Sequence, residues 1–144
     1  DGIMHVVDWF PTLLNLVGHP EKVPTDRLID GIDQTAFVTG QQEKSNRIKF
    51  PMYFDALHVG WRYKNFKILT HKIEGGLAPI QQLAIPHCIN LTVDPEESLP
   101  MQYEDAHSWL LYKLAPVLNA EHYASLEKDS VPFMAPLDFN PYKK

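Results

Sequence analysis

The amino-acid sequence predicts an α+β fold, in which a small antiparallel β-sheet of about four strands packs against a long C-terminal helix. Three patterns support this prediction. Apolar residues recur with helical spacing in residues 8–17, and they do so again from residue 103 onward. Between these segments, residues 50–71 are rich in aromatic residues and partly alternate in polarity, which is typical of strands. With 144 residues, the chain is long enough to bury a hydrophobic core.

The first predicted element is a helix from Asp8 to Val17. Asp8 is a suitable N-cap, and Pro11 falls in the first turn, where its missing N–H costs nothing. Gly18 then supplies the C-terminal stop. One face of this helix is apolar and requires a cover, because its side chains follow the i, i+3, i+4, i+7 spacing. These side chains are Phe10, Leu13, Leu14 and Val17.

The segment between this helix and the strands, residues 19–46, is polar and rich in turn residues. Its short apolar patch Ala36-Phe37-Val38 predicts a single helical turn. So long a connection is typical of a functional loop or of one held by another domain. We therefore predict two parts, residues 1–46 and residues 47–144. Because the chain opens with Asp1-Gly2 rather than with Met, we expect it to be a piece of a longer protein or a processed product.

The middle third of the chain predicts the sheet. The second and third strands are joined by a tight connection at Lys64-Asn65, and the last strand is closed by a turn at residues 93–97. Residues 74–86, with Gly75-Gly76 and two prolines, are predicted to be a loop. The predicted strands are residues 50–54, 57–63 and 65–71, with a further one around residues 89–91.

Alternation along the second strand places its side chains on two faces of the sheet. His58, Gly60 and Arg62 are predicted on one face, and Val59, Trp61 and Tyr63 on the other. His58 and Arg62 are our candidates for residues of a substrate cleft, because together they could bind an anion or donate a proton. The alternative for Arg62 is a salt bridge to a neighbouring acid.

The C-terminal helix is predicted to run from about Tyr103 to Ala115, and to continue or restart after Pro116 toward Leu126. The tail from Ser130 onward contains several prolines and is predicted to be extended. Its apolar residues indicate that it wraps a surface.

Composition and charge exclude several classes of partner. The net charge of −5 comes without a basic stripe, which argues against nucleic acid. No stretch reaches the roughly 20 apolar residues that cross a bilayer. Cys88 is the one cysteine, so it forms no internal disulfide, and its apolar surroundings indicate a small buried side chain.

The acidic and histidine residues show no spacing typical of a metal site, and we predict neither metal nor cofactor in this chain. The seven histidines are scattered. Asp30-Gly31-Ile32-Asp33 lacks the further oxygen ligands that calcium requires, so that a loop-fixing role is predicted for it. Asn90-Leu91-Thr92 matches a glycosylation sequon, but it begins in a predicted strand and we interpret the match as accidental.

Four segments in the same order resemble the C-terminal region of bacterial type I arylsulfatases, the formylglycine-dependent enzymes of the alkaline-phosphatase-like superfamily. Residues 5–18 look like the helix that follows the last catalytic motif of that family. Residues 24–34, with Asp30-Gly31-Ile32-Asp33, are similar to its "DG.D" stretch, which Glu43 to Arg47 continues. Residues 60–68 resemble its strand pair with a Trp-Arg…Lys pattern, and residues 89–97 resemble its "NL..DP.E" turn.

The chain departs from that family where the reaction takes place. Such sulfatases convert the Cys or Ser of a C/S-x-P/A-S/A-R motif to formylglycine, beside a calcium held by Asp and Asn side chains. Cys88 is followed by Ile89-Asn90-Leu91-Thr92, which does not fit that motif. Glu74-Gly75-Gly76 shares only three letters with a later family motif. The resemblance therefore implies that formylglycine and calcium belong to a preceding N-terminal part, and we expect the isolated chain to be inactive.

The resemblance also implies a partner and a place. The partner is the N-terminal catalytic domain of a sulfatase, to whose α/β core the helix at residues 8–17 belongs. The parent protein is expected to be periplasmic or secreted, and the isolated chain is expected to associate through the exposed apolar face of that helix. Two hypotheses of function follow. The chain is either a non-catalytic sulfatase subdomain that packs and lines the cleft, or a free-standing binding module with a sulfatase-derived fold.

Overall fold

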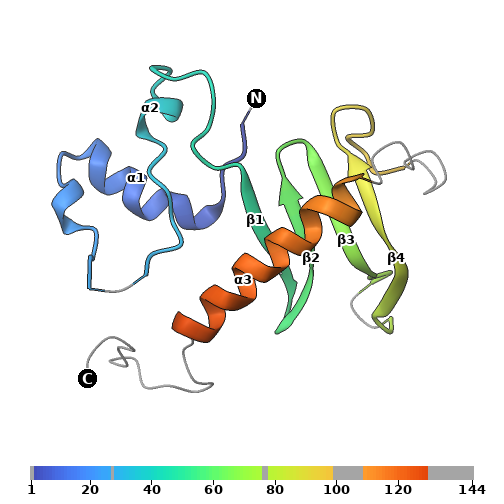
Figure 1. The fold of residues 1–144 in the computed structure, drawn as a ribbon. Helices are drawn as coiled ribbons and strands as arrows, with labels where there is room; N and C mark the ends of the chain where they lie inside the picture. Colours follow the sequence, from blue (N-terminus) through green and yellow to red (C-terminus); the bar gives the residue numbers. More distant parts are fainter. Residues whose placement is uncertain (1, 27, 76–77, 99–108, 130–144) are drawn as a thin grey trace. The chain divides into compact units, whose positions relative to one another are not determined.

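The computed structural model describes residues 2–26, 28–75, 78–98 and 109–129, and its helices and strands are drawn in Figure 1. The chain forms two compact units. One, the N-terminal unit, consists of Asp1–Ile48 with Tyr123–Lys144, and the other, the sheet unit, consists of Lys49–His122. The division into domains at residues 46 and 47 stays a prediction. Among the helices of the described residues, none combines the length and apolar character that crossing a bilayer requires.

The N-terminal unit is built from short helices joined by turns (Figure 1). The predicted helix is confirmed, although Asp8 belongs to a 3-10 helix that directly precedes it. The single helical turn predicted around residues 36–38 is confirmed as well. Gly18 takes the left-handed φ of 81° that ends a helix, as its position predicts. The elements are η1 (Val6–Asp8), α1 (Trp9–Leu16), η2 (Pro20–Lys22) and α2 (Thr35–Val38).

The sheet unit contains a four-stranded antiparallel sheet in the order β1-β2-β3-β4, which confirms the predicted α+β fold. The tight connection between β2 and β3 is confirmed at Lys64, whose left-handed φ of 48° lets the chain reverse direction. The strands are β1 (Lys49–Phe54), β2 (Leu57–Tyr63), β3 (Phe66–Lys72) and β4 (Gln81–Asn90).

The last strand is much longer than the sequence predicted. The expected loop at residues 74–86 is wrong in its second half, because β4 begins at Gln81. The register between β3 and β4 shifts between Leu69 and His71, so that the partners change from His87 to Gln82. Pro86 falls in this irregular stretch of an edge strand, a position where the missing N–H of proline is tolerated. The two prolines and two glycines of the segment therefore misled the prediction.

A β-bulge in β2 changes which of its residues share a face. Tyr53 pairs with His58 and Met52 with Gly60, so that Val59 is the extra residue of the bulged strand. Strict alternation therefore fails, and His58 lies on the same face as Trp61, with the two ring centroids 5.3 Å apart. The prediction that His58 and Arg62 share a face is wrong for this reason.

The helical segment of the sheet unit covers the face that carries Trp61. A π-helical turn, η5 (Leu110–Leu114), leads directly into α3 (Ala115–Asp129). Pro116 stands in the first turn of α3, so that the helix continues through it. The expected start of this helix near residue 103 and the expected wrapping tail lie outside the described residues.

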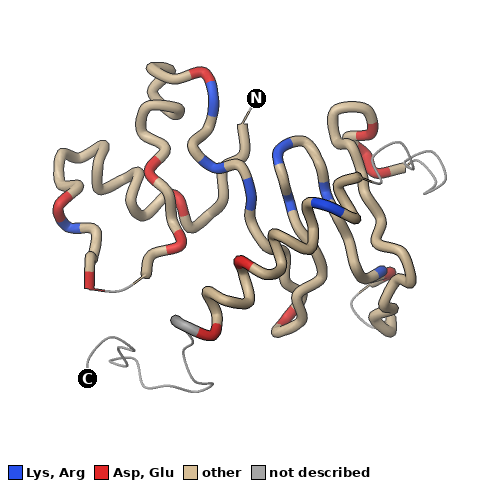
Figure 2. The backbone as a smooth tube through the Cα atoms, in the orientation of Figure 1, with Lys and Arg blue, Asp and Glu red and all other residues tan. Residues whose placement is uncertain are grey.

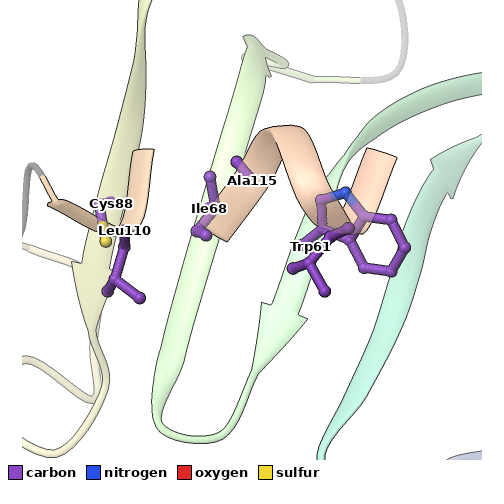
Figure 3. Packing of buried hydrophobic residues seen from close by; sticks show 6 residues of the cluster. Trp61, Ile68, Cys88, Leu110 and Ala115 are labelled. Atoms are coloured by element: carbon purple, nitrogen blue, oxygen red, sulfur yellow. The ribbon is translucent and has the colours of Figure 1, made fainter. Parts of the chain in front are cut away.

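The core of this unit lies between the sheet and the helix, and Figure 3 shows its packing. Ile68 and Leu110 have no exposed surface, and Trp61 retains 3%. Cys88 is buried in the same cluster, which confirms its interpretation as a small apolar side chain. The cluster consists of Trp61, Ile68, Cys88, Leu110, Ala115 and Leu118.

Candidate functional site

His58, the first candidate, belongs to a cluster of rings between the β1–β2 hairpin and α3. Its ring centroid lies 5.4 Å from that of Tyr53, 5.3 Å from that of Trp61 and 5.5 Å from that of His122. Burial lowers the pKa of His58 below its ordinary range, and the charges of His122 and His71 lower it further. The side chain therefore favours the neutral state, in which it can act as a hydrogen-bond donor or acceptor but carries no charge for an anion.

Polar contacts fasten the helix to this part of the sheet. The indole Nε1 of Trp61 donates to Oδ1 of Asn119 at 2.7 Å, and the hydroxyl of Tyr53 lies 2.5 Å from Nε2 of His122. Since Trp61 is buried, its N–H requires such an acceptor. These contacts explain His58 and its neighbours as residues that hold the helix on the sheet.

Arg62, the second candidate, stands on the opposite face. It pairs in register with Phe50 on β1 and with Lys67 on β3. Burial lowers the pKa of Arg62, while the charge of Glu97 raises it. Its Nη1 atom is buried and has no hydrogen-bond partner in the described part of the chain. The predicted alternative, a salt bridge to a neighbouring acid, is not formed by Arg62 within these residues, because the nearby Glu97 pairs with Lys67.

The ion pair beside Arg62 is well defined. Lys67 Nζ lies 2.9 Å and 2.6 Å from the two carboxylate oxygens of Glu97. Glu97 belongs to the turn after β4, and Asp94 holds this turn by accepting from the backbone N–H of Ser98 at 3.0 Å. The turn predicted from Asp94-Pro95 is therefore confirmed, and it carries the carboxylate to the strand pair.

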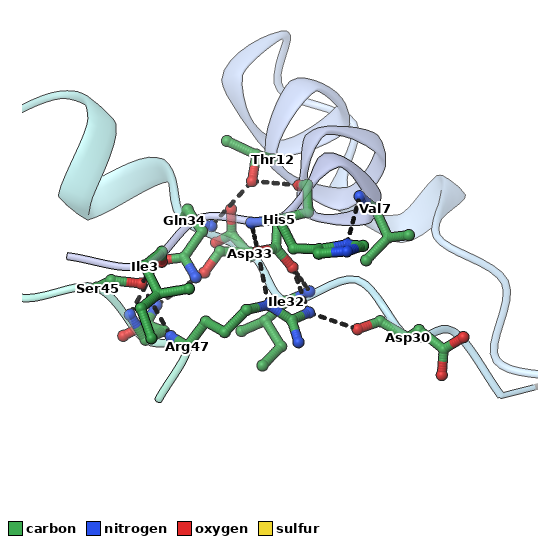
Figure 4. Close-up of polar contacts among 12 residues, drawn as sticks. Ile3, His5, Val7, Thr12, Asp30, Ile32, Asp33, Gln34, Ser45 and Arg47 are labelled. Atoms are coloured by element: carbon green, nitrogen blue, oxygen red, sulfur yellow. Dashed lines mark hydrogen bonds and ion pairs between the residues drawn. The ribbon is translucent and has the colours of Figure 1, made fainter. Parts of the chain in front are cut away.

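A second polar centre lies in the N-terminal unit, where Asp8 and Arg47 form a buried ion pair (Figure 4). Asp8 has no exposed surface and Arg47 retains 8%. Arg47 Nε donates to one carboxylate oxygen of Asp8 at 2.7 Å, and Nη2 donates to the other at 2.5 Å. Nη2 also donates to the backbone carbonyl of Asp30 at 2.7 Å. Such a fork-to-fork pair holds three segments of the chain together.

The predicted role of Asp8 as a helix cap is wrong. Its side chain makes no capping bond to α1 and instead accepts from the backbone N–H groups of His5 at 2.9 Å and Ile32 at 2.8 Å. Burial alone would raise the pKa of Asp8, but the hydrogen bonds from Arg47, Ile32 and His5 and the positive charge of Arg47 outweigh it and lower the pKa. Asp8 is therefore an ionised structural residue.

The Asp30-to-Asp33 loop is fixed by this network, as the sequence predicted. Asp33 accepts from the side chain of Asn15 at 2.7 Å and from the backbone and hydroxyl of Thr35. Gly31 is required because a Cβ atom there would lie 2.3 Å from the carbonyl oxygen of Val7. Within the described residues, no group of three or more His, Cys, Asp or Glu side chains could hold a metal ion.

The structure therefore separates the two predicted site residues and adds others that sequence reasoning missed. Lys67 and Glu97 surround Arg62, while Tyr53 and His122 surround His58. No pattern in the sequence marks these neighbours, because they come from separate strands, a turn and a helix. The alternation along β2 was the one signal in the sequence for which residues share a face, and the bulge places His58 on the other face.

Comparison with known proteins supports a sulfatase-like fold. No family model matches the chain. Among solved structures, the chain is similar to the crystal structure of PsFucS1 sulfatase from Pseudoalteromonas sp., with a TM-score of 0.74 and 26% sequence identity. The match covers 94% of this chain and 28% of that one, so the chain spans less than a third of the sulfatase that it resembles.

Proposed function

We propose that this chain is the C-terminal subdomain of a sulfatase, which packs against a catalytic domain and lines part of its substrate cleft. The main support for this proposal is the structural comparison, in which 94% of this chain matches only 28% of a solved sulfatase. The order of segments that resemble the C-terminal region of arylsulfatases supports a position at that end of the parent enzyme. The formylglycine nucleophile and its calcium would belong to the catalytic domain, and the parent enzyme is expected to act outside the cytoplasm.

The apolar surface of α1 supports the packing role. Phe10 is 48% exposed and Leu13 51%, on a helix of only eight residues, and Val17, directly after the helix, is 66% exposed. Contiguous apolar surface of this kind is typical of an interface. In this proposal the helix belongs to the α/β core of the parent enzyme, and the catalytic domain covers these side chains.

The proposed role in the substrate cleft concerns two residues, Arg62 and His58. Arg62 is the stronger of the two candidates, because its guanidinium is permanently charged and its buried Nη1 has no acceptor among the described residues, while the lowered pKa of His58 favours the neutral imidazole. We therefore assign contact with a bound anion to Arg62, and a supporting position behind the β1–β2 hairpin to His58.

The proposal is tested on the complete 144-residue chain. We expect no hydrolysis of an aryl sulfate, with or without calcium, and turnover by the pure chain would overturn the proposal. We also expect the chain to bind an apolar dye and to self-associate through α1. Changing Phe10→Gln and Leu13→Gln together should abolish both effects, whereas Lys44→Gln, on an exposed loop of the same unit, should change neither.

A free-standing binding module is the second candidate, and the well-buried core of the sheet unit favours it. The module hypothesis predicts a monomer that melts cooperatively and does not bind the apolar dye. Size-exclusion chromatography with light scattering distinguishes the subdomain hypothesis from the module hypothesis. A monomeric, dye-free chain would favour the module and contradict the subdomain.

A further inference from the structure

The surroundings of Arg62 contain more positive than negative charge. On this face of the sheet, Arg62 and Lys67 are direct neighbours in the β2–β3 ladder, and Figure 2 shows basic residues along these adjacent strands. The nearby carboxylate is that of Glu97, and both of its oxygens are taken by Lys67. His87 stands on the same face, opposite Leu69. In the described part of the chain, two permanent cations therefore share the carboxylate of Glu97.

The position of that carboxylate is set by the backbone. Glu97 has a left-handed φ of 56°, which non-glycine residues adopt rarely. Asp94, which is buried, accepts from both the backbone N–H and the hydroxyl of Ser98 and so closes the turn. The turn held in this way carries Glu97, whose carboxylate pairs with Lys67.

Among the described residues, the guanidinium of Arg62 therefore lacks an acceptor for one of its nitrogens. Its Nη1 is buried and, within the residues that the structure describes, unpaired. More than nine in ten buried polar groups in proteins find a partner, and an unpaired charged one is costly. The side chain as a whole is only partly buried and has several rotatable bonds, so an anion from solvent can reach it.

We infer that Arg62, with Lys67 beside it, forms an oxyanion-binding site whose ligand is a sulfate group. A planar guanidinium next to an ammonium matches the several acceptor oxygens of a tetrahedral oxyanion. A bound sulfate supplies the missing acceptor to Arg62 and brings the local charge of Arg62, Lys67 and Glu97 close to balance. This inference deepens the proposed function and rests on it for the source of the group, a sulfated substrate, but the binding itself is measured without that assumption.

The experiment titrates the complete chain with sodium sulfate and, at equal ionic strength, with sodium chloride. Binding is followed through the Nε–H signals of arginine in NMR spectra, which are simple because the chain contains only Arg27, Arg47 and Arg62. We expect a saturable shift of the Arg62 signal with sulfate and not with chloride. A linear response, or equal shifts of all three signals, would show an adventitious ion only and overturn the site.

Two variants test whether sulfate binding depends on Arg62. Arg62→Gln should weaken sulfate binding by roughly tenfold or more, as the loss of a charge-assisted contact does. Lys72→Gln removes the same charge from the exposed end of β3 and should leave binding unchanged. Sulfate also stabilises proteins by exclusion from their surface, so the sulfate-dependent gain in melting temperature is compared between these variants. Equal gains would contradict the site.

A further variant and a second anion distinguish a loss of sulfate binding from a loss of folding and from a failure of the proposed function. If Arg62→Gln fails to fold, Arg62→Lys keeps the charge but not the fork, and it should bind sulfate more weakly than the wild type. Sodium acetate tests the other source of an acceptor, a carboxylate from a companion domain. Acetate binding without sulfate binding would overturn the inference, while the absence of hydrolysis and the dye binding of α1 would still support the proposed function.

Discussion

The two units of this chain differ in the kind of side chain that they bury. The N-terminal unit buries an ion pair, Asp8 with Arg47, together with Thr12 and Gln34, and leaves the apolar side of α1 exposed. The sheet unit buries Trp61 and its apolar neighbours between a sheet and a helix. The first unit thus has a polar interior and exposed apolar side chains on α1, while the second buries an apolar cluster.

The same contrast appears in the two arginines. Arg47 gives hydrogen bonds to both oxygens of Asp8 and to the carbonyl of Asp30. Arg62 keeps a buried nitrogen that no described residue accepts from. The difference indicates that Arg47 stabilises its own unit, whereas Arg62 is available to bind a group that the described residues do not supply. Stability and binding can therefore be tested separately in the two units.

The largest expected effect comes from breaking the ion pair. Asp8→Ala leaves Arg47 buried without its partner and should destabilise the N-terminal unit by about 3–5 kcal/mol. Amide hydrogen exchange at His5 and Ile32, whose N–H groups donate to Asp8, measures the loss. Glu43→Gln, at an exposed position of the same unit, is the control and should change exchange little. Unchanged protection in Asp8→Ala would contradict a structural role for the pair.

The matching change in the sheet unit removes the largest ring of its core. Trp61→Ala should cost about 3–5 kcal/mol, because a cavity remains and Asn119 loses its donor. Urea denaturation followed by far-ultraviolet circular dichroism measures this loss. Trp109, which is 52% exposed, provides a control of equal chemistry, and Trp109→Ala should cost far less. Similar losses in the two variants would mean that the helix does not pack on the sheet as described.

Two glycines allow close backbone approaches, one in each unit. A Cβ at Gly60 would lie 2.0 Å from the carbonyl oxygen of Ile68, and one at Gly31 would lie 2.3 Å from that of Val7. Each change to Ala should cost about 1–3 kcal/mol by overpacking. Gly40→Asn is the control, because its left-handed φ of 75° suits Asn and no atom lies within 4 Å of the new Cβ. Thermal melts should rank both Ala variants below it.

The smallest expected effect is a pH dependence confined to the sheet unit. The folded-state pKa of His58 is lowered by burial and by the charges of His122 and His71, so the unfolded chain binds more protons in acid. The stability that follows is fully present above the ordinary pKa of about 6.5 and is lost as the pH falls below it. His58→Phe should flatten the melting temperature between pH 7 and pH 5. His19→Gln, at an exposed position, should leave the slope unchanged.

Much of the fold could be predicted from the sequence, because its signals are local. The spacing of apolar residues in α1, the alternation in β2 and the Lys64-Asn65 turn each lie within a few residues of one another. Asp94-Pro95 and Gly18 likewise act on their own neighbourhood. In each case the residue type restricts the backbone directly, and the element forms where the pattern occurs.

The candidate site could be predicted only in part. Arg62 was identified from its residue type and strand, but its pairing with Lys67 and its separation from His58 depend on the register of neighbouring strands. A single extra residue in a bulge reverses the faces of a strand, and no local pattern marked Val59 as that residue. The Tyr53, His58, Trp61 and His122 cluster likewise joins a hairpin to a helix that follows about sixty residues later.

By itself, then, the sequence determined the class of fold, most of its elements, the burial of Cys88 and the resemblance to the end of a sulfatase. The tertiary structure alone decided that Asp8 pairs with Arg47 instead of capping α1, that β4 begins at Gln81, and that Nη1 of Arg62 lacks an acceptor among the described residues. The physical reason is the range of the interactions. Turns and helices follow from neighbouring residues, whereas the pairing of charges and the register of strands follow from contacts between segments far apart in the chain.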